Sequence, residues 1–119
     1  MKVYVAAKWE EKEAARRAQR ELRSLGHSIT FDWTTGDGKN QESEAKSDLQ
    51  GVELADAVIV LNHDRLFGGA TEMGIAIGNR IPVYVVNHHV RDNIFFHLPE
   101  GVTMCESVED AIYRMVAND

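Results

Sequence analysis

Short apolar runs recur along the chain, and each is followed by a longer segment of mixed polarity. The runs at 3–7 and 57–61 are apolar or aromatic at every position, which is typical of parallel strands that are buried on both faces. Less uniform runs at 28–33, 81–86 and 102–105 are rich in β-branched or apolar residues and predict three more strands. The hydrophobic pattern therefore predicts five strands.

The segments between these runs predict helices. Within residues 10–25, apolar side chains recur at intervals of four, four and three, which marks one face of a helix, and Gly26 follows as a stop. These side chains are Ala14, Ala18, Leu22 and Leu25. Residues 68–78 predict a helix whose first turn is rich in glycine and carries Glu72. Ser107 is the expected N-cap of a final helix.

The segment between the second and third predicted strands is mostly polar. Residues 34–47 contain one apolar residue, Ala45, and are typical of a loop or of a lead-in to a helix. The sequence Ser47-Asp48-Leu49-Gln50 matches a capping box, so a short helix is expected to start or restart there and to run through Leu54, with Asp48 in its first turn. Residues 87–99 show no clear period and predict a loop with a helical turn.

The alternation of strands and helices predicts a parallel sheet that is covered by helices on both faces. Five strands favour a flavodoxin-like α/β fold, a three-layer sandwich with strand order 2-1-3-4-5. A length of 119 residues suits one domain, since most domains have roughly 100–150 residues. We therefore expect a single domain over 1–119.

Composition and charge narrow the range of partners. Thirteen Lys and Arg against nineteen Asp and Glu give a net charge of −6, and the largest basic cluster is Arg16-Arg17, so duplex nucleic acid is not an expected partner. No apolar run approaches the ~18 residues of a membrane span, and the first residues do not resemble a signal peptide. Cys105, the single cysteine, is expected to be buried in a protein of the reducing cytoplasm.

The predicted fold places a ligand site at the carboxyl ends of the strands, where strand order reverses between the first and third strands. Lys8 and Trp9 follow the first strand, and a turn with Gly68 and Gly69 follows the third. Asp48 begins the helix that follows the second strand. These residues are therefore expected to meet in one cleft.

Several common kinds of site are not expected. Gly36-x-Gly38 lacks the third glycine of a dinucleotide-binding turn. The five histidines do not show the helical spacing of a metal site, and no Gly-x-Ser-x-Gly elbow is present. We expect neither a metal nor a cofactor.

Glu72 and Asp48 remain as a pair of candidate catalytic carboxylates. Each has a structural alternative, because a glutamate in a first helical turn favours the helix dipole and an aspartate after Ser47 can assist a cap. Small residues around Glu72 leave room for close approach of a ligand. We expect the positive end of the helix to keep this carboxylate ionised.

Three sequence blocks, in this order, carry a resemblance to a known family. The first is the strand and small-residue turn at 3–9, and the second runs from Asp48 to Val52 and continues to Asp56 and an apolar strand. The third is the glycine-rich turn that ends Glu-Met-Gly-Ile-Ala at 72–76. Together they resemble the nucleoside 2-deoxyribosyltransferases and the related 2′-deoxynucleoside 5′-phosphate N-hydrolases.

The resemblance implies roles for the site residues. Glu72 would be the nucleophile that attacks the anomeric carbon of a (deoxy)nucleoside or its 5′-monophosphate, with Tyr4 hydrogen-bonded to its carboxylate. Asp48 would assist the departing base, and Trp9 would pack against that base. The reaction would be transfer or hydrolysis at the N-glycosidic bond through a covalent intermediate. From its position alone, Trp33 either closes over the site with the loop after it or packs in the core.

The resemblance also implies further contacts and an assembly. Gly68 and Gly69 would belong to the substrate site, and Lys8 and Arg65 would either supply positive charge to a 5′-phosphate or remain surface residues. Asn93 falls near the position at which family members reach into a neighbouring subunit's site. The active form would therefore be a homodimer or a larger homo-oligomer.

The sequence departs from the family six residues before Glu72. The transferases carry an aspartate there and the phosphate hydrolases a serine, whereas this chain has Leu66. A second hypothesis is therefore a non-catalytic nucleotide-binding or regulatory module that keeps the fold and the carboxylate. A third hypothesis is a flavodoxin-like carrier or a receiver-type signalling domain, since the fold hosts many functions. The receiver is disfavoured because Lys8 and Asn62 stand where its acidic residues are needed.

Overall fold

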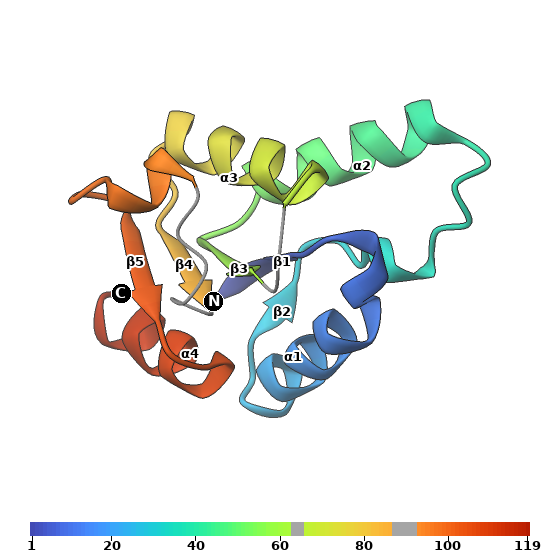
Figure 1. Ribbon diagram of the computed structural model, residues 1–119. Helices are drawn as coiled ribbons and strands as arrows, with labels where there is room; N and C mark the ends of the chain where they lie inside the picture. Colours follow the sequence, from blue (N-terminus) through green and yellow to red (C-terminus); the bar gives the residue numbers. More distant parts are fainter. Residues whose placement is uncertain (63–65, 87–92) are drawn as a thin grey trace.

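The computed structural model describes residues 1–62, 66–86 and 93–119, and it shows a five-stranded parallel sheet between two layers of helices (Figure 1). The strand order is β2-β1-β3-β4-β5, which confirms the flavodoxin-like prediction. The strands are β1 (Lys2–Ala6), β2 (Ser28–Ile29), β3 (Ala57–Leu61), β4 (Val83–Val86) and β5 (Val102–Cys105).

The described ranges contain the helices α1 (Lys12–Ser24), α2 (Gln41–Glu53), α3 (Gly68–Gly78) and α4 (Val108–Ala117). Short 3₁₀ helices occur at η1 (Trp9–Glu11), η2 (Trp33–Thr35) and η3 (Ile94–His97). In Figure 1, α2 and α3 cover one face of the sheet, and α1 and α4 cover the other. None of the helices described here has both the length and the apolar character to cross a membrane.

The central strand β1 contributes to both cores. Val3 and Val5 pack in the core with α1 and α4, whereas Tyr4 and Ala6 pack in the core with α2 and α3. All four side chains are fully buried. Because successive side chains of a strand point to opposite faces, the even position of Tyr4 places its phenol among the residues of α2 and α3.

The second predicted strand is much shorter than expected, because β2 ends at Ile29. The chain then turns into η2, which is held by side-chain hydrogen bonds. Trp33 Nε1 donates to the Val5 carbonyl oxygen (2.6 Å), and Arg16 Nη2 donates to the Thr34 carbonyl oxygen (2.9 Å). These bonds fix residues 33–34 against β1 and α1 instead of extending the sheet.

The helix predicted from residue 47 begins at Gln41. Asn40 is its N-cap, and the Asn40 side chain accepts a hydrogen bond from the Ser43 N–H (3.1 Å). The earlier cap provides the hydrogen bond that an N-terminus requires, so a helix start at Ser47 is wrong and the alternative of a helical lead-in before Ser47 is confirmed. Asp48 therefore lies in the middle of α2 rather than in its first turn.

The apolar face of α1 also differs from the prediction. Ala15, Ala18 and Leu22 are buried, whereas Leu25 is 58% exposed. The helix at 68–78 and the strands at 57–61 and 102–105 are confirmed with their predicted bounds. Ser107 caps α4 by accepting the Asp110 N–H (3.0 Å), as predicted.

Gly51 allows α2 to lie close to β1. A Cβ at this position would lie 2.8 Å from Phe31 Cβ and 3.1 Å from two ring atoms of Tyr4. In the interior of α3, by contrast, a Cβ on Gly74 would meet no atom within 4 Å. The two helical glycines therefore differ in what a methyl group would encounter.

We expect Gly51→Ala and Gly74→Ala to change stability in opposite directions. The steric cost at Gly51, roughly 1–3 kcal/mol, should exceed the gain in helix propensity of about 1 kcal/mol, so this variant should lose about 1 kcal/mol of unfolding free energy. Gly74→Ala should gain roughly 0.5–1 kcal/mol from propensity. Urea unfolding measures the unfolding free energy of both variants. A Gly51→Ala protein that is more stable than wild type would show that α2 is not packed tightly on Tyr4.

Candidate functional site

Three polar side chains from three elements meet on the α2–α3 side of the sheet. They are Tyr4 of β1, Asp48 of α2 and Glu72 of α3. The Tyr4 hydroxyl donates a hydrogen bond to Glu72 Oε2. Tyr4 is fully buried and Glu72 is 8% exposed, while Asp48 is close enough to raise the pKa of both. The cluster therefore joins the central strand to both helices of this layer.

Small residues at the start of α3 allow this helix to lie close to the end of β1. A Cβ on Gly69 would lie 3.1 Å from Leu66 Cδ2 and 3.8 Å from the Ala7 nitrogen. Glu72 follows one turn later, on the side of α3 that faces Tyr4. The glycine-rich turn thus brings the carboxylate to the sheet.

Burial controls the charge of these groups. Removal from water raises the pKa of Glu72 to about 8; the Tyr4 hydrogen bond opposes this shift and the charge of Asp48 adds to it. Burial, together with the charge of Glu44, raises the pKa of Asp48 to about 6. Burial and both carboxylates also raise the pKa of the Tyr4 phenol, so this hydroxyl remains the proton donor.

The expectation that the helix end keeps Glu72 ionised is wrong. Glu72 lies beyond the first turn of α3, and no acidic residue occupies that turn. The influence of the helix dipole falls off within the first turn, whereas desolvation acts on the whole buried carboxyl. Burial therefore decides the direction of the pKa shift.

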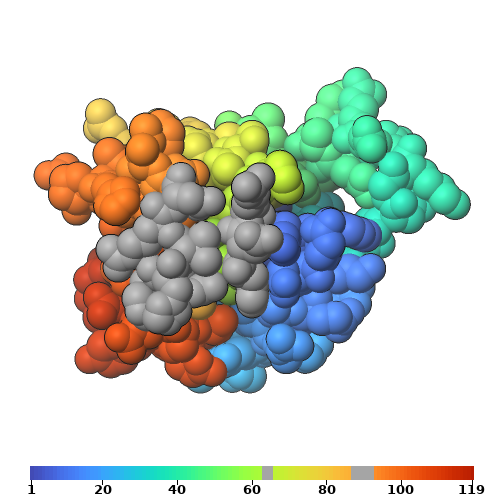
Figure 2. Space-filling view, in the orientation of Figure 1, coloured from blue at the N-terminus to red at the C-terminus, as the bar shows by residue number. Residues whose placement is uncertain are grey.

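Two adjoining hollows lie next to the cluster. The carboxylate lobe, about 270 Å³, is lined by Ala7, Lys8, Trp9, Glu10, Trp33, Asp48, Phe67, Gly68 and Glu72. The aromatic lobe, about 340 Å³, is lined by Trp9, Phe31, Trp33, Gly36, Asp37, Gly38, Glu44 and Asp48. They share Trp9, Trp33 and Asp48 and together fall within the range of small-molecule sites, roughly 300–1,000 Å³. In Figure 2, residues before and at the start of α2 (cyan) project from the body of the molecule.

Two tryptophans form the wall that the lobes share. The ring centroids of Trp9 and Trp33 are 6.2 Å apart and their planes are tilted by 45°. Trp33 is fixed by its hydrogen bond to Val5, and Lys12 Nζ lies 4.7 Å from the centroid of the Trp9 ring. Trp9 is 46% exposed, which leaves part of the indole available to a ligand.

The structure brings most of the predicted site residues together. Those that line the carboxylate lobe are Lys8, Trp9, Asp48, Gly68 and Glu72. Gly69 packs against the end of β1 instead of lining either lobe. Asn93 lies elsewhere: it caps η3 by accepting the Phe95 N–H (2.9 Å) and lines a hollow beside α3. Arg65 lies outside the described residues.

Sequence reasoning missed Glu44 and Phe31. Glu44 stands four residues before Asp48, so both lie on one side of α2 and line the aromatic lobe. That spacing becomes informative only when the helix is known to begin at Gln41. Over the described ranges, no group of three or more His, Cys, Asp or Glu side chains could hold a metal ion.

Solved structures of two enzymes have the same fold. The 2-deoxyribosyltransferase of Bacillus psychrosaccharolyticus matches with a TM-score of 0.72 and 22% sequence identity, over 92% of this chain and 89% of that chain. The CMP N-glycosidase of Clostridium botulinum matches with a TM-score of 0.68 and 16% identity, over 100% of both chains. A scan against protein-family models and a search of curated proteins found no match. The likeness establishes a shared fold.

We expect Glu72→Gln to stabilise the protein at alkaline pH. A carboxyl whose pKa is higher in the folded state makes wild-type stability fall as the pH rises from about 4.5 through about 8. Glutamine does not ionise, and its carbonyl can still accept the Tyr4 hydrogen bond. The difference in unfolding free energy should therefore grow from near zero at low pH to on the order of 4 kcal/mol above pH 8.

Urea unfolding at a series of pH values measures this difference. Glu42→Gln, on the exposed side of α2, serves as the matched control for loss of one carboxylate. If the unfolding free energies of wild type and Glu72→Gln changed with pH in the same way, the charged form of Glu72 would not be costly to bury.

Proposed function

We propose that this chain is an enzyme that transfers or hydrolyses the N-glycosidic bond of a (deoxy)nucleoside or its 5′-monophosphate, with Glu72 as the nucleophile. The proposal is carried by the buried Glu72 carboxylate, which is held by Tyr4 and lines a cavity that adjoins an aromatic lobe. A 2-deoxyribosyltransferase and a CMP N-glycosidase of the same fold support it.

The two lobes suit the two halves of a nucleoside. The base lies in the aromatic lobe, where indole and phenyl faces can stack on it. The sugar lies in the carboxylate lobe with its anomeric carbon beside Glu72, and its 5′ end faces Lys8 and Gly68. Asp48 lines both lobes and so lies where the bond between sugar and base is placed.

This placement supports a two-step reaction. A Glu72 oxygen forms a bond to the anomeric carbon while the bond from that carbon to the base nitrogen breaks, and the electron pair leaves with the base. Asp48 gives its proton to the base. Water or a second base then attacks the anomeric carbon, the ester to Glu72 breaks, and Asp48 accepts the proton of the attacking group.

The reaction needs one proton on the carboxyl pair, on Asp48 rather than on Glu72. The pKa of about 8 for Glu72 and of about 6 for Asp48 favour the opposite arrangement in the empty site. The Tyr4 hydroxyl interacts with both carboxyls. It can therefore pass the proton from Glu72 to Asp48 when a base that accepts a hydrogen bond from Asp48 occupies the aromatic lobe.

We further propose that the active form is a homodimer or a larger homo-oligomer. An apolar hollow beside α3 is lined by Ala70, Met73, Gly74, Ile77, Gly78, Asn93 and Phe95. Ile94, next to Asn93 in the chain, is 78% exposed, and Phe95 of the same hollow is 51% exposed, so this surface offers adjacent apolar side chains for a partner to cover. A second copy on this surface would bury them and bring Asn93 to an intersubunit position.

We expect wild type, and not Glu72→Ala, to release or exchange base from at least one member of a panel of deoxynucleosides and their 5′-monophosphates. Loss of the nucleophile should lower the rate by on the order of 10³-fold or more. Chromatography of reactions with and without an acceptor base separates transfer from hydrolysis, and circular dichroism confirms that the variant is folded. Nucleotide binding without turnover by wild type would instead establish the non-catalytic module.

We also expect a bell-shaped pH dependence of kcat/KM with limbs near pH 6 and pH 8. Both carboxyls are protonated below the first limb, and both are ionised above the second. Asp48→Asn should lower the rate by roughly 10²–10⁴-fold, the usual contribution of a general acid. The kcat/KM of Asp48→Asn should rise with pH and show no second limb, because Glu72 is then the one carboxyl whose ionisation controls the rate. A bell retained in Asp48→Asn would exclude Asp48 as the proton donor.

A further inference from the structure

The aromatic lobe offers hydrogen-bond acceptors and almost no donors. Its polar side chains, apart from the two indoles, are the carboxylates of Asp37, Glu44 and Asp48, and among the described residues that line it none is Lys, Arg, His, Asn or Gln. Asp48 Oδ1 is buried and accepts no hydrogen bond within the described chain. In the proposed reaction Asp48 carries a proton and donates to the base, so the ionised acceptors that a ligand in this lobe must satisfy with its own N–H groups are Glu44 and Asp37.

Three N–H donors of the lobe are already used within the chain. The Gly36 N–H donates to the Trp33 carbonyl oxygen (3.2 Å), and the Gly38 N–H donates to Glu44 Oε1 (3.1 Å). The Trp33 indole N–H donates to Val5. Apart from the Trp9 indole, the side-chain groups of the described lining that remain to meet an incoming base are carboxyls.

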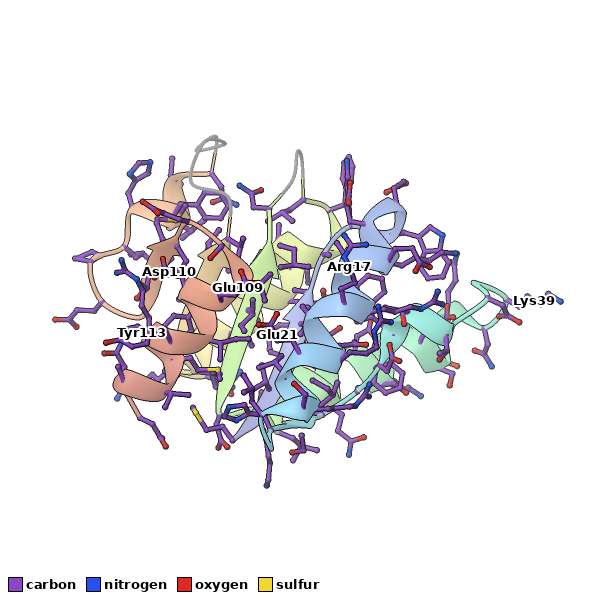
Figure 3. All side chains as sticks on the ribbon, turned by 90° about the horizontal axis from the view of Figure 1, so that it is seen from below. Arg17, Glu21, Lys39, Glu109, Asp110 and Tyr113 are labelled. Carbon is purple, nitrogen blue, oxygen red and sulfur yellow. The ribbon has the colours of Figure 1, made fainter. Side chains whose placement is uncertain are left out.

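Glu44 is held in place by the loop that it contacts. Gly38 adopts a φ of +74°, which favours glycine, and a Cβ on Gly36 would overlap the Glu44 carboxylate. With Oε1 bound to the Gly38 N–H, Oε2 remains free to accept from a ligand. The two lysines nearest to Glu44 in the sequence do not pair with it, because Lys39 extends away from the molecule (Figure 3) and Lys46 pairs with Glu42 (3.7 Å).

We propose that Glu44 selects bases that carry an exocyclic amino group, such as cytosine or adenine, over their oxo counterparts. This inference rests on the proposed function only in taking the aromatic lobe as the base site. An amino group donates its N–H to the Glu44 carboxylate, a charge-assisted hydrogen bond. A carbonyl oxygen in the same place sets its lone pairs against the negative charge of the Glu44 carboxylate. No hydrogen bond forms between the carbonyl oxygen and the carboxylate.

The test compares cytosine, which has a 4-amino group and an unprotonated N3, with uracil, which has a 4-oxo group and an N3–H. We expect wild type to prefer the deoxycytidine compound by on the order of 100-fold in kcat/KM, and Glu44→Gln to lower that ratio at least tenfold, because its amide can donate to a carbonyl oxygen. Any effect of Glu44 on the pKa of Asp48 acts on both substrates and cancels in the ratio. Glu42→Gln, two residues earlier on the exposed side of α2, should leave the ratio unchanged.

A second readout does not depend on catalysis. Trp9 and Trp33 are the two tryptophans of the chain and both line the aromatic lobe, so their fluorescence reports titration with free cytosine or uracil. If wild type binds cytosine more tightly than uracil and Glu44→Gln does not, the inference is supported even when no nucleoside is turned over. The absence of turnover would contradict only the proposed catalysis. Turnover with equal use of both bases, selectivity retained in Glu44→Gln, or no binding of either base would overturn it.

Discussion

The buried hydrogen bond from Tyr4 to Glu72 connects the centre of the sheet to the layer of helices above it. Tyr4 comes from β1, which is covered on both faces, and Glu72 from α3, which reaches β1 through its glycine-rich first turn. The ring of Tyr4 is also the surface against which α2 packs at Gly51. The position of α2 then fixes Asp48 and Glu44, one and two turns before that glycine. The geometry of the site is thus a consequence of how two helices pack on one aromatic ring.

This arrangement buries the Tyr4 phenol and the Glu72 carboxyl and partly buries the Asp48 carboxyl. A low dielectric environment penalises charge on each of them, so the carboxyls hold a proton to a higher pH than they do in water. Perturbed groups of this kind are more common at functional sites than elsewhere, although structural networks can produce them as well. Here the cavity beside the cluster and its aromatic walls support the functional interpretation that we propose.

The sequence predicts the sheet well because its signals are local. β3 and α3 combine uniform apolar or small-residue patterns with clear bounds, and strand alternation is sufficient to place Tyr4 opposite Val3 and Val5. The region from residue 30 to residue 47 was predicted poorly because tertiary contacts decide it. Bonds from Trp33 and Arg16 end β2 early, and the Asn40 cap starts α2 earlier than the pattern at Ser47 indicates. Glu44 was missed for the same reason, and the raised pKa of Glu72 depends on burial that helix position alone does not reveal.

The segment that was hardest to predict is also separate from the sheet. Between η2 and the first turn of α2, the chain is attached at one end through Arg16 and Thr34 and at the other through Glu44 and Gly38. No strand pairing passes through it. Its length and composition can therefore change by insertion, deletion or substitution without shifting the register of β1 or moving Tyr4 and Glu72. The fold separates the part of the chain that holds the Glu72 carboxylate from a part that evolution or engineering can vary, and new ligand preferences can arise there while the central cluster is retained.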